Sequence, residues 1–200
     1  SYQVRASYTW SKSRGNTGGG FVPLANFQFL DDLNLDQNEG PTDVDRRHNF
    51  VLSGAAVIPK TGGVTFSTVV RFLSGLPFTV QDTTLDNDRN GVLFEPLPAG
   101  SYNGTCPATG PCNLFPVDSE GGRNGAGGPN FFQWDARLGY RFKLGGVRYL
   151  EAFGEVFNLT NQTNFNNPTG DRFSTAFLRL TALRPGGSPR TAQRGPRVSL

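Results

Sequence analysis

A short acidic motif near the middle of the chain offers the side chains best suited to chemistry. Residues 86–91 read DNDRNG, which places side-chain oxygens at alternate positions and ends in a glycine that permits a sharp turn. This matches the first half of a calcium-binding loop, with Asp86, Asp88 and Asn90 as candidate ligands. The motif lacks the twelfth-position glutamate of an EF-hand, so Glu95 or a loop carbonyl would complete the shell. The alternative is an ordinary turn rich in Asp and Asn.

The two cysteines form the second candidate site. Cys106 and Cys112 lie close together in a Pro- and Gly-rich stretch, and the chain has no other cysteine. In an exported protein this pattern predicts one local disulfide. The alternative is a pair of free or metal-binding thiols, which would lack both CxxC spacing and a histidine partner.

The sequence does not predict an enzyme. Glu151 and Glu155 share one face of an expected strand and resemble paired glycosidase carboxylates. We expect them instead to pair with Arg137 or Arg141 across a hairpin. Because no phosphate-binding loop, catalytic triad or zinc spacing appears, we predict no catalytic residues and no cofactor beyond the calcium ion considered above.

The elements that must position these residues are long β-strands. The clearest is residues 131–144, where the even positions are all apolar and the odd positions from 133 onward are polar or glycine. The apolar residues are Phe132, Trp134, Ala136, Leu138, Tyr140, Phe142 and Leu144. A strand that crosses a membrane needs roughly 9–11 residues and alternates in this way, with aromatic residues near its ends. The alternative is a long strand of a soluble β-sandwich.

The spacing of strands and loops favours the membrane interpretation. We expect strands at 1–10, 47–58, 64–72, 131–144, 147–158 and 190–200. The connections alternate between long loops (11–45, 74–130 and 159–189) and short turns (59–63 and 145–146). Outer-membrane barrels sort their connections in this way, with short periplasmic turns and long extracellular loops. We therefore predict an all-β fold: a fragment of an antiparallel transmembrane β-barrel with about six long strands.

Composition and charge limit the other possibilities. The net charge is +3, and the C-terminal arginines are spaced singly, which does not indicate a nucleic-acid partner. The chain contains no methionine and has no signal sequence at its start, so we expect it to be part of a longer protein. Six strands are also too few to close a transmembrane barrel, because the smallest known has eight.

Four motifs together resemble a known family. They are YTWSKS (8–13), DRRHNFVLSG (45–54), SGLPFT (74–79) and EVFNLTN (155–161). In this order they resemble the C-terminal third of TonB-dependent outer-membrane receptors, in the subgroup with an N-terminal carboxypeptidase-regulatory-like domain. The resemblance implies that residues 1–200 belong to a barrel of about 22 strands around a plug, which moves a substrate across the outer membrane.

The resemblance also implies a location and partners. The protein would lie in the outer membrane of a Gram-negative-type bacterium, in contact with its lipid and lipopolysaccharide. It would engage the TonB complex through an N-terminal region outside this chain, and the barrel-assembly machinery would read its last strand. The end departs from the pattern, because Pro196 cannot donate to a ladder and Leu200 replaces the usual aromatic residue. The sequence therefore leaves open whether residues 190–200 pair with a neighbouring strand.

Three interpretations of the function remain open from the sequence. The first is the transport barrel, whose substrate the sequence does not identify. The second is a structural or adhesive surface β-protein assembled from several copies, and the third is a soluble all-β enzyme or binding module. The cluster at Arg46, Arg47 and His48 would contact lipopolysaccharide phosphates in the first reading, or pair with Asp43 or Asp45 as a purely structural rim group.

Overall fold

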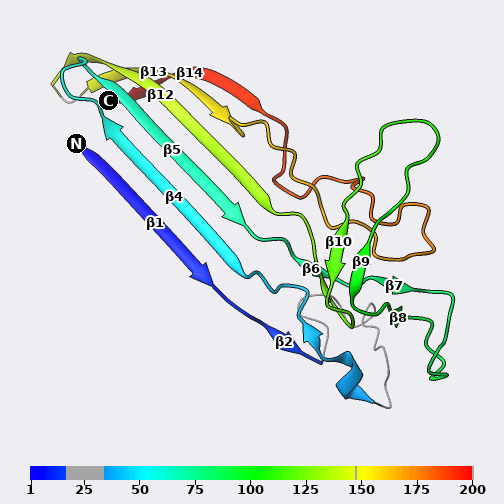
Figure 1. Cartoon of the computed structure of the whole chain (residues 1–200). Helices are drawn as coiled ribbons and strands as arrows, with labels where there is room; N and C mark the ends of the chain where they lie inside the picture. The colour runs from blue at the N-terminus through cyan, green and yellow to red at the C-terminus, as the bar shows by residue number, and fades with distance from the viewer. Residues whose placement is uncertain (17–33, 147, 200) are drawn as a thin grey trace.

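The main feature of the fold is a long, twisted antiparallel sheet (Figure 1). A computed structural model describes residues 1–16, 34–146 and 148–199. Six strands form the sheet: β1 (Tyr2–Trp10), β4 (His48–Val57), β5 (Val64–Leu73), β12 (Phe131–Gly145), β13 (Arg148–Phe157) and β14 (Thr191–Ser199). Their order, β1-β4-β5-β12-β13-β14, follows the chain. The six strands expected from the sequence are confirmed, with ends that differ by a few residues.

The strand register aligns the apolar faces of neighbouring strands across the sheet, with Arg194 in the middle of β14 as a charged exception. Leu138 lies opposite Phe66 of β5 and Gly154 of β13, and the even-numbered residues of every strand share this face. Its large side chains are solvent-exposed: Tyr2 is 87% exposed and Leu138 is 57% exposed. A soluble protein rarely exposes an apolar surface of this extent, whereas hydrocarbon contact stabilises it. Within the described residues no helix has the length and apolar character needed to cross a membrane.

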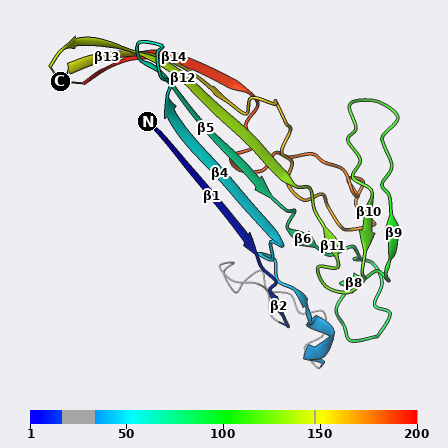
Figure 2. The ribbon, with the colours of Figure 1, turned by 60° about the vertical axis from the view of Figure 1, so that its left-hand side comes forward.

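The two ends of the sheet differ as the sequence predicts. Both tight turns and both chain termini lie at one end, and all the long connections leave from the other (Figures 1 and 2). The β4–β5 turn contains Lys60 and Gly62 with positive φ, and the β12–β13 turn contains Gly145 and Gly146 with positive φ. Glycine adopts this conformation at little steric cost. The end of the sheet with the two short turns is therefore compact, and the long connections lie at the opposite end.

The long connections are more ordered than the sequence suggests. We expected 74–130 to be a loop, but it contains several short strands, four of which pair in the order β6-β11-β10-β9 (Figure 2). Its strands are β6 (Pro77–Phe78), β7 (Gln81–Asp82), β8 (Glu95–Pro96), β9 (Gly100–Tyr102), β10 (Val117–Ser119) and β11 (Ala126–Gly127). The first connection adds β2 (Arg14–Gly15), the 3₁₀ turn η2 (Leu35–Asn38) and β3 (Gly40–Pro41). Strands this short leave almost no alternation to detect.

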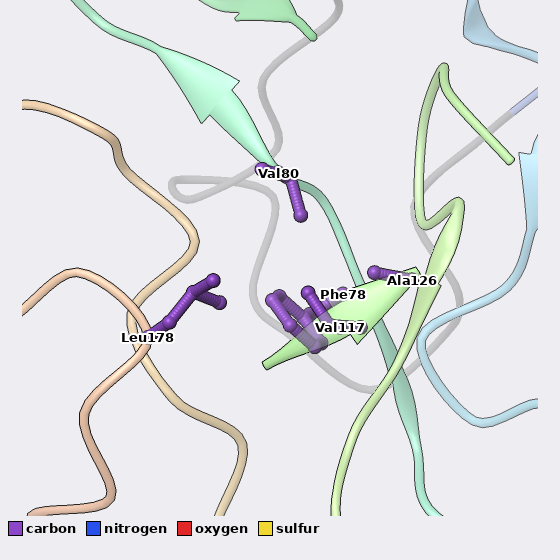
Figure 3. Close-up of a cluster of buried hydrophobic side chains, with 5 residues drawn as sticks. All are labelled: Phe78, Val80, Val117, Ala126 and Leu178. Atoms are coloured by element: carbon purple, nitrogen blue, oxygen red, sulfur yellow. The ribbon is translucent and has the colours of Figure 1, made fainter. Parts of the chain in front are cut away.

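The hydrophobic core lies in this loop layer and not under the main sheet. Phe78, Val80, Val117, Ala126 and Leu178 are buried together (Figure 3), with Leu178 at 0% and Val80 at 1% exposure. Leu178 comes from the connection between β13 and β14, so the core joins two of the long loops. The main sheet has no comparable core in the described residues, which is what a sheet with one face toward lipid requires.

The last strand pairs, which resolves the point left open by the sequence. β14 runs antiparallel to β13, with Pro196 opposite Ala152 and Val198 opposite Leu150. β14 is an edge strand of the described sheet, so the missing N–H of Pro196 can face away from the ladder.

Candidate functional site

The polar face of the main sheet carries a connected network of charges centred on Arg137. Arg137 Nη1 lies 2.8 Å from Glu155 Oε1, and its Nη2 lies 3.3 Å from Glu151 Oε1. The guanidinium also stacks 3.8 Å from the ring centroid of Phe153. Glu151 is buried, at 3% exposure. The expectation that the two glutamates pair with arginines across the hairpin is confirmed, so neither resembles a free catalytic acid.

A glycine makes room for this network. A side chain at Gly139 would place its Cβ 2.8 Å from Glu151 Oε1 and 2.7 Å from Thr65 Oγ1. Arg141 approaches Glu151 from the other side, with Nε 3.6 Å from Oε2. This role of Gly139 could not be predicted from the sequence, because it depends on the register of β12 with both β5 and β13.

A second polar group lies nearer the loop end of the sheet. Arg71 Nη2 donates to Gln133 Oε1 at 2.9 Å and lies 3.9 Å from Asp135 Oδ2. The Asp135 carboxylate also accepts the backbone N–H of Asn158 at 2.9 Å. This hydrogen bond links the polar face to Asn158, the first residue of the connection between β13 and β14.

The polar face has more basic than acidic side chains. Its acids are Asp135, Glu151 and Glu155, and its cations are Arg5, Arg71, Arg137, Arg141, Lys143 and Arg197. Within the described part of the chain, the ion pairs of this face involve only three of these cations. A hollow of about 440 Å³ lies on this face beside Arg5, Ser53 and Arg137. The arrangement suits the wall of a polar interior.

The Asp-Arg-Arg-His motif forms a structural joint at the loop end of the sheet. Asp45, which is 4% exposed, accepts the Ser13 N–H at 2.9 Å and pairs with Arg47 Nε at 3.1 Å. Among the residues that the structure describes, no acid pairs with His48; its Nδ1 lies 2.8 Å from the hydroxyl oxygen of Tyr8. The structural interpretation therefore holds for Arg47, and His48 has a different partner from those expected.

The acidic motif lies in the connection between β7 and β8. Carboxylate oxygens of Asp86, Asp88 and Glu95 lie within 4.8 Å of one another. The third candidate, Asn90, donates from Nδ2 to Asp88 Oδ2 at 2.9 Å, and its Oδ1 accepts the Val92 N–H at 2.7 Å. Asn90 thus orients Asp88 and the turn. Three convergent carboxylates suit a hard cation such as calcium, and calcium binding here stays a prediction.

The pKa of Glu95 is shifted in the direction that a cluster of carboxylates produces. Its pKa is raised, first by burial and then by the negative charges of Asp88 and Asp86. Without a cation, the folded loop therefore holds a proton more readily than the unfolded chain. This contribution stabilises the loop at low pH and is lost as pH rises through the raised pKa. A bound cation would instead favour the ionised form of Glu95. Calcium should therefore stabilise the loop most at pH values above this pKa.

Calcium is expected to protect residues 82–98 from proteolysis, at roughly 10⁻⁴–10⁻³ M as in other extracellular sites. Asp86→Ala combined with Asp88→Ala should abolish the protection, whereas Glu120→Ala, which removes an exposed acid outside the cluster, should retain it. Limited proteolysis with peptide mapping, in calcium and in chelator at two pH values, measures this. Magnesium should protect less, because it dehydrates reluctantly. Equal cleavage with calcium and with chelator would show an acidic turn without a metal.

The cysteines are joined as predicted. Cys106 and Cys112 form a disulfide with a Cα–Cα distance of 5.7 Å, in the connection between β9 and β10. The alternative of free or metal-binding thiols is therefore wrong for this structure. The closed loop is small, so the bond constrains the local segment rather than the sheet.

Replacement of both cysteines by serine is expected to loosen only the β9–β10 connection. Loop-closure entropy for so short a loop gives about 2 kcal/mol of local stabilisation. Hydrogen exchange should rise at residues 103–116 and stay unchanged in β12.

Non-reducing peptide mapping of exported wild-type protein should recover the linked peptide, and free thiols at both positions in intact cells would contradict the assignment.

These features define a class: a segment of a transmembrane β-barrel wall, apolar outside and polar inside, with a folded layer of loops at one end. A family model described as "Outer membrane beta barrel domain" matches residues 1–193, and the chain belongs to that family. Membership places it in the outer membrane of a Gram-negative-type bacterium. No curated protein and no solved structure matches the chain.

Proposed function

We propose that this chain is part of the barrel of a TonB-dependent transporter that moves a substrate across the outer membrane, and that it is not an enzyme. The observation that carries the proposal is the main sheet, which is apolar on one face and ion-paired on the other, with both edges unpaired among the described residues. Open edges are not viable in lipid, so further strands must complete the barrel. A polar wall suits a wide barrel with a plugged lumen.

The placement of the family-like motifs supports this proposal. Ser74 of SGLPFT donates its N–H to the His48 carbonyl at 2.9 Å, and its Oγ accepts the His48 N–H at 3.1 Å. Asn158 of EVFNLTN donates to the carbonyls of Gln162 and Ser188. The motifs thus hold the loop layer onto the ends of the strands. Such a joint would hold the base of the loops at the mouth of the barrel.

The partners follow from the same proposal. The TonB complex would engage an N-terminal plug region outside this chain, and the barrel-assembly machinery would read β14. Outer-membrane lipid and lipopolysaccharide would surround the apolar face. No nucleic-acid partner is proposed.

Binding to TonB tests the proposal without knowledge of the substrate. The full-length protein that carries this chain, purified in detergent, is expected to bind the periplasmic domain of TonB from the same host in a pull-down. A full-length variant without its N-terminal plug region should fold and lose the binding. If the full-length protein shows no affinity for TonB, the transport proposal fails.

The second candidate function is a structural or adhesive surface protein assembled from several copies. The unpaired edges of β1 and β14 favour it, because two copies could pair along them. Cross-linking followed by mass measurement separates the two proposals. A transporter gives one closed barrel per polypeptide, whereas an assembled surface protein gives ordered multimers.

A further inference from the structure

Two arginines at the loop end of the main sheet have no counter-ion within residues 1–16, 34–146 and 148–199. Arg184 is 9% exposed; its Nη2 donates to the Pro129 carbonyl at 3.3 Å, and its buried Nη1 has no hydrogen-bond partner in that part of the chain. Arg46 is partly buried and donates from Nη1 to the Ser74 carbonyl at 2.8 Å. In the described residues neither arginine forms a salt bridge. The carboxylate of Asp45, next to Arg46 in the chain, is taken by Arg47 and Ser13.

The carbonyls that the two guanidinium groups bind belong to two backbone segments that cross closely. The segment that leaves β5 meets the segment that enters β12, where Gly128 donates its N–H to the Leu76 carbonyl at 2.9 Å. A side chain on Gly75 would collide with the Gly128 carbonyl. Arg46 binds a carbonyl on one side of this crossing and Arg184 binds one on the other.

This arrangement is costly without an anion. Burial lowers the pKa of both arginines, and the charge of Arg46 lowers that of Arg184 further, so the two positive charges repel. A buried charge without a partner destabilises a fold strongly, and an unmade hydrogen bond adds to the cost. Guanidinium groups bind phosphoryl oxygens well, because their N–H groups form a planar fork.

We propose that Arg46 and Arg184 form a binding site for an oxyanion, specifically a phosphoryl group, at the outer end of the sheet. The site lies at the expected height of the lipid headgroups: Arg46 is two residues before His48, and Ser74 is two residues after Phe72 on the apolar face. The phosphoryl group could come from an outer-leaflet lipopolysaccharide headgroup or from free phosphate. The inference does not depend on transport or on TonB.

A melting experiment tests the site in the full-length protein, refolded in detergent free of lipopolysaccharide. Inorganic phosphate should raise the midpoint of heat-induced unfolding by roughly 2–4 °C over chloride at equal ionic strength. Arg46→Gln and Arg184→Gln should each abolish the increase. Arg190→Gln, which alters an exposed arginine of the same connection, should keep it.

Added lipopolysaccharide distinguishes the two sources. If the headgroup is the ligand, lipopolysaccharide should raise the midpoint at far lower concentration than phosphate does, and dephosphorylated lipopolysaccharide should not. If only inorganic phosphate acts, the site takes the free ion. No shift with either ligand, or the same shift in the Arg46 and Arg184 variants, would overturn the proposal.

A measurement on wild-type protein covers the case in which the variants fail to fold. Phenylglyoxal modifies accessible arginines, and peptide mapping reports each position. Phosphate should slow the modification of Arg46 several-fold while leaving Arg190 unchanged. Equal rates at Arg46 in phosphate and in chloride would overturn the proposal independently of any substitution.

Discussion

Leu138→Arg is expected to block insertion of the sheet into a bilayer. Leu138 lies mid-strand in β12 on the apolar face, and its side chain is 57% exposed in the isolated sheet, where lipid would cover it. An arginine at the midplane of a barrel wall costs about 2–4 kcal/mol. The full-length variant should show a large loss of the heat-modifiable folded band after refolding into vesicles.

The matched control places the same residue on the opposite face. Ser53 lies mid-strand in β4 on the polar face and lines the hollow beside Arg137. Ser53→Arg is therefore expected to insert nearly as well as the wild-type protein. Equal losses for Leu138→Arg and Ser53→Arg would contradict the assignment of the two faces.

Arg137→Leu is expected to destabilise the folded barrel strongly. Arg137 lies on the polar face, so the loss does not come from contact with lipid. It arises because this one side chain partners both Glu151 and Glu155. Removal of one partner from a buried ion pair costs roughly 3–5 kcal/mol, and partial exposure of Arg137 to solvent should bring the loss toward the lower end. The midpoint of urea unfolding in lipid measures it.

Removal of the two carboxylate charges that Arg137 partners should restore part of this loss. Arg137→Leu combined with Glu151→Gln and Glu155→Gln is expected to be more stable than Arg137→Leu alone. Arg5→Leu, on the same face but without an ion pair in the described structure, should have little effect. If the triple variant is no more stable than Arg137→Leu, the loss comes from packing on Phe153 rather than from charge.

The long strands could be predicted because their signal is local. Period-two alternation over nine or more residues, as in β1 and β12, fixes both the element and the face of each side chain. The alternation of short turns with long connections then gives the strand order. The pairing of β14 needed the structure, because Pro196 weakens the local signal while the edge position tolerates it.

The loop layer could not be predicted, because its contacts join distant segments. Asn124 shows this: its Nδ2 donates to the Pro41 carbonyl at 2.8 Å and to Asp43 Oδ1 at 2.6 Å. Leu178 likewise completes a core whose other members come from residues 78–126. No short window of sequence contains both sides of such a contact.

The candidate metal cluster was predictable only in part. Asp86 and Asp88 converge because they are neighbours in one turn. Glu95 joins them because β7 pairs with β8, which places Asp82 opposite Glu95 and closes the turn between them. The hydrogen bonds of Asn90, from Nδ2 to Asp88 Oδ2 and from the Val92 N–H to its Oδ1, could not be read from the motif. Ligand spacing indicates the chemistry, but the competition of backbone groups for the same oxygens appears only in the fold.

Spin labels scanned along β12 test the central claim most directly. In full-length protein with both cysteines replaced by serine, a single label is placed at each position from 132 to 142 and the protein is reconstituted in lipid. We predict a period of two, with even positions accessible to oxygen dissolved in the bilayer and odd positions accessible to a water-soluble nickel reagent or buried. Accessibility to the nickel reagent at even and odd positions alike would show that this sheet does not form the wall of a membrane barrel.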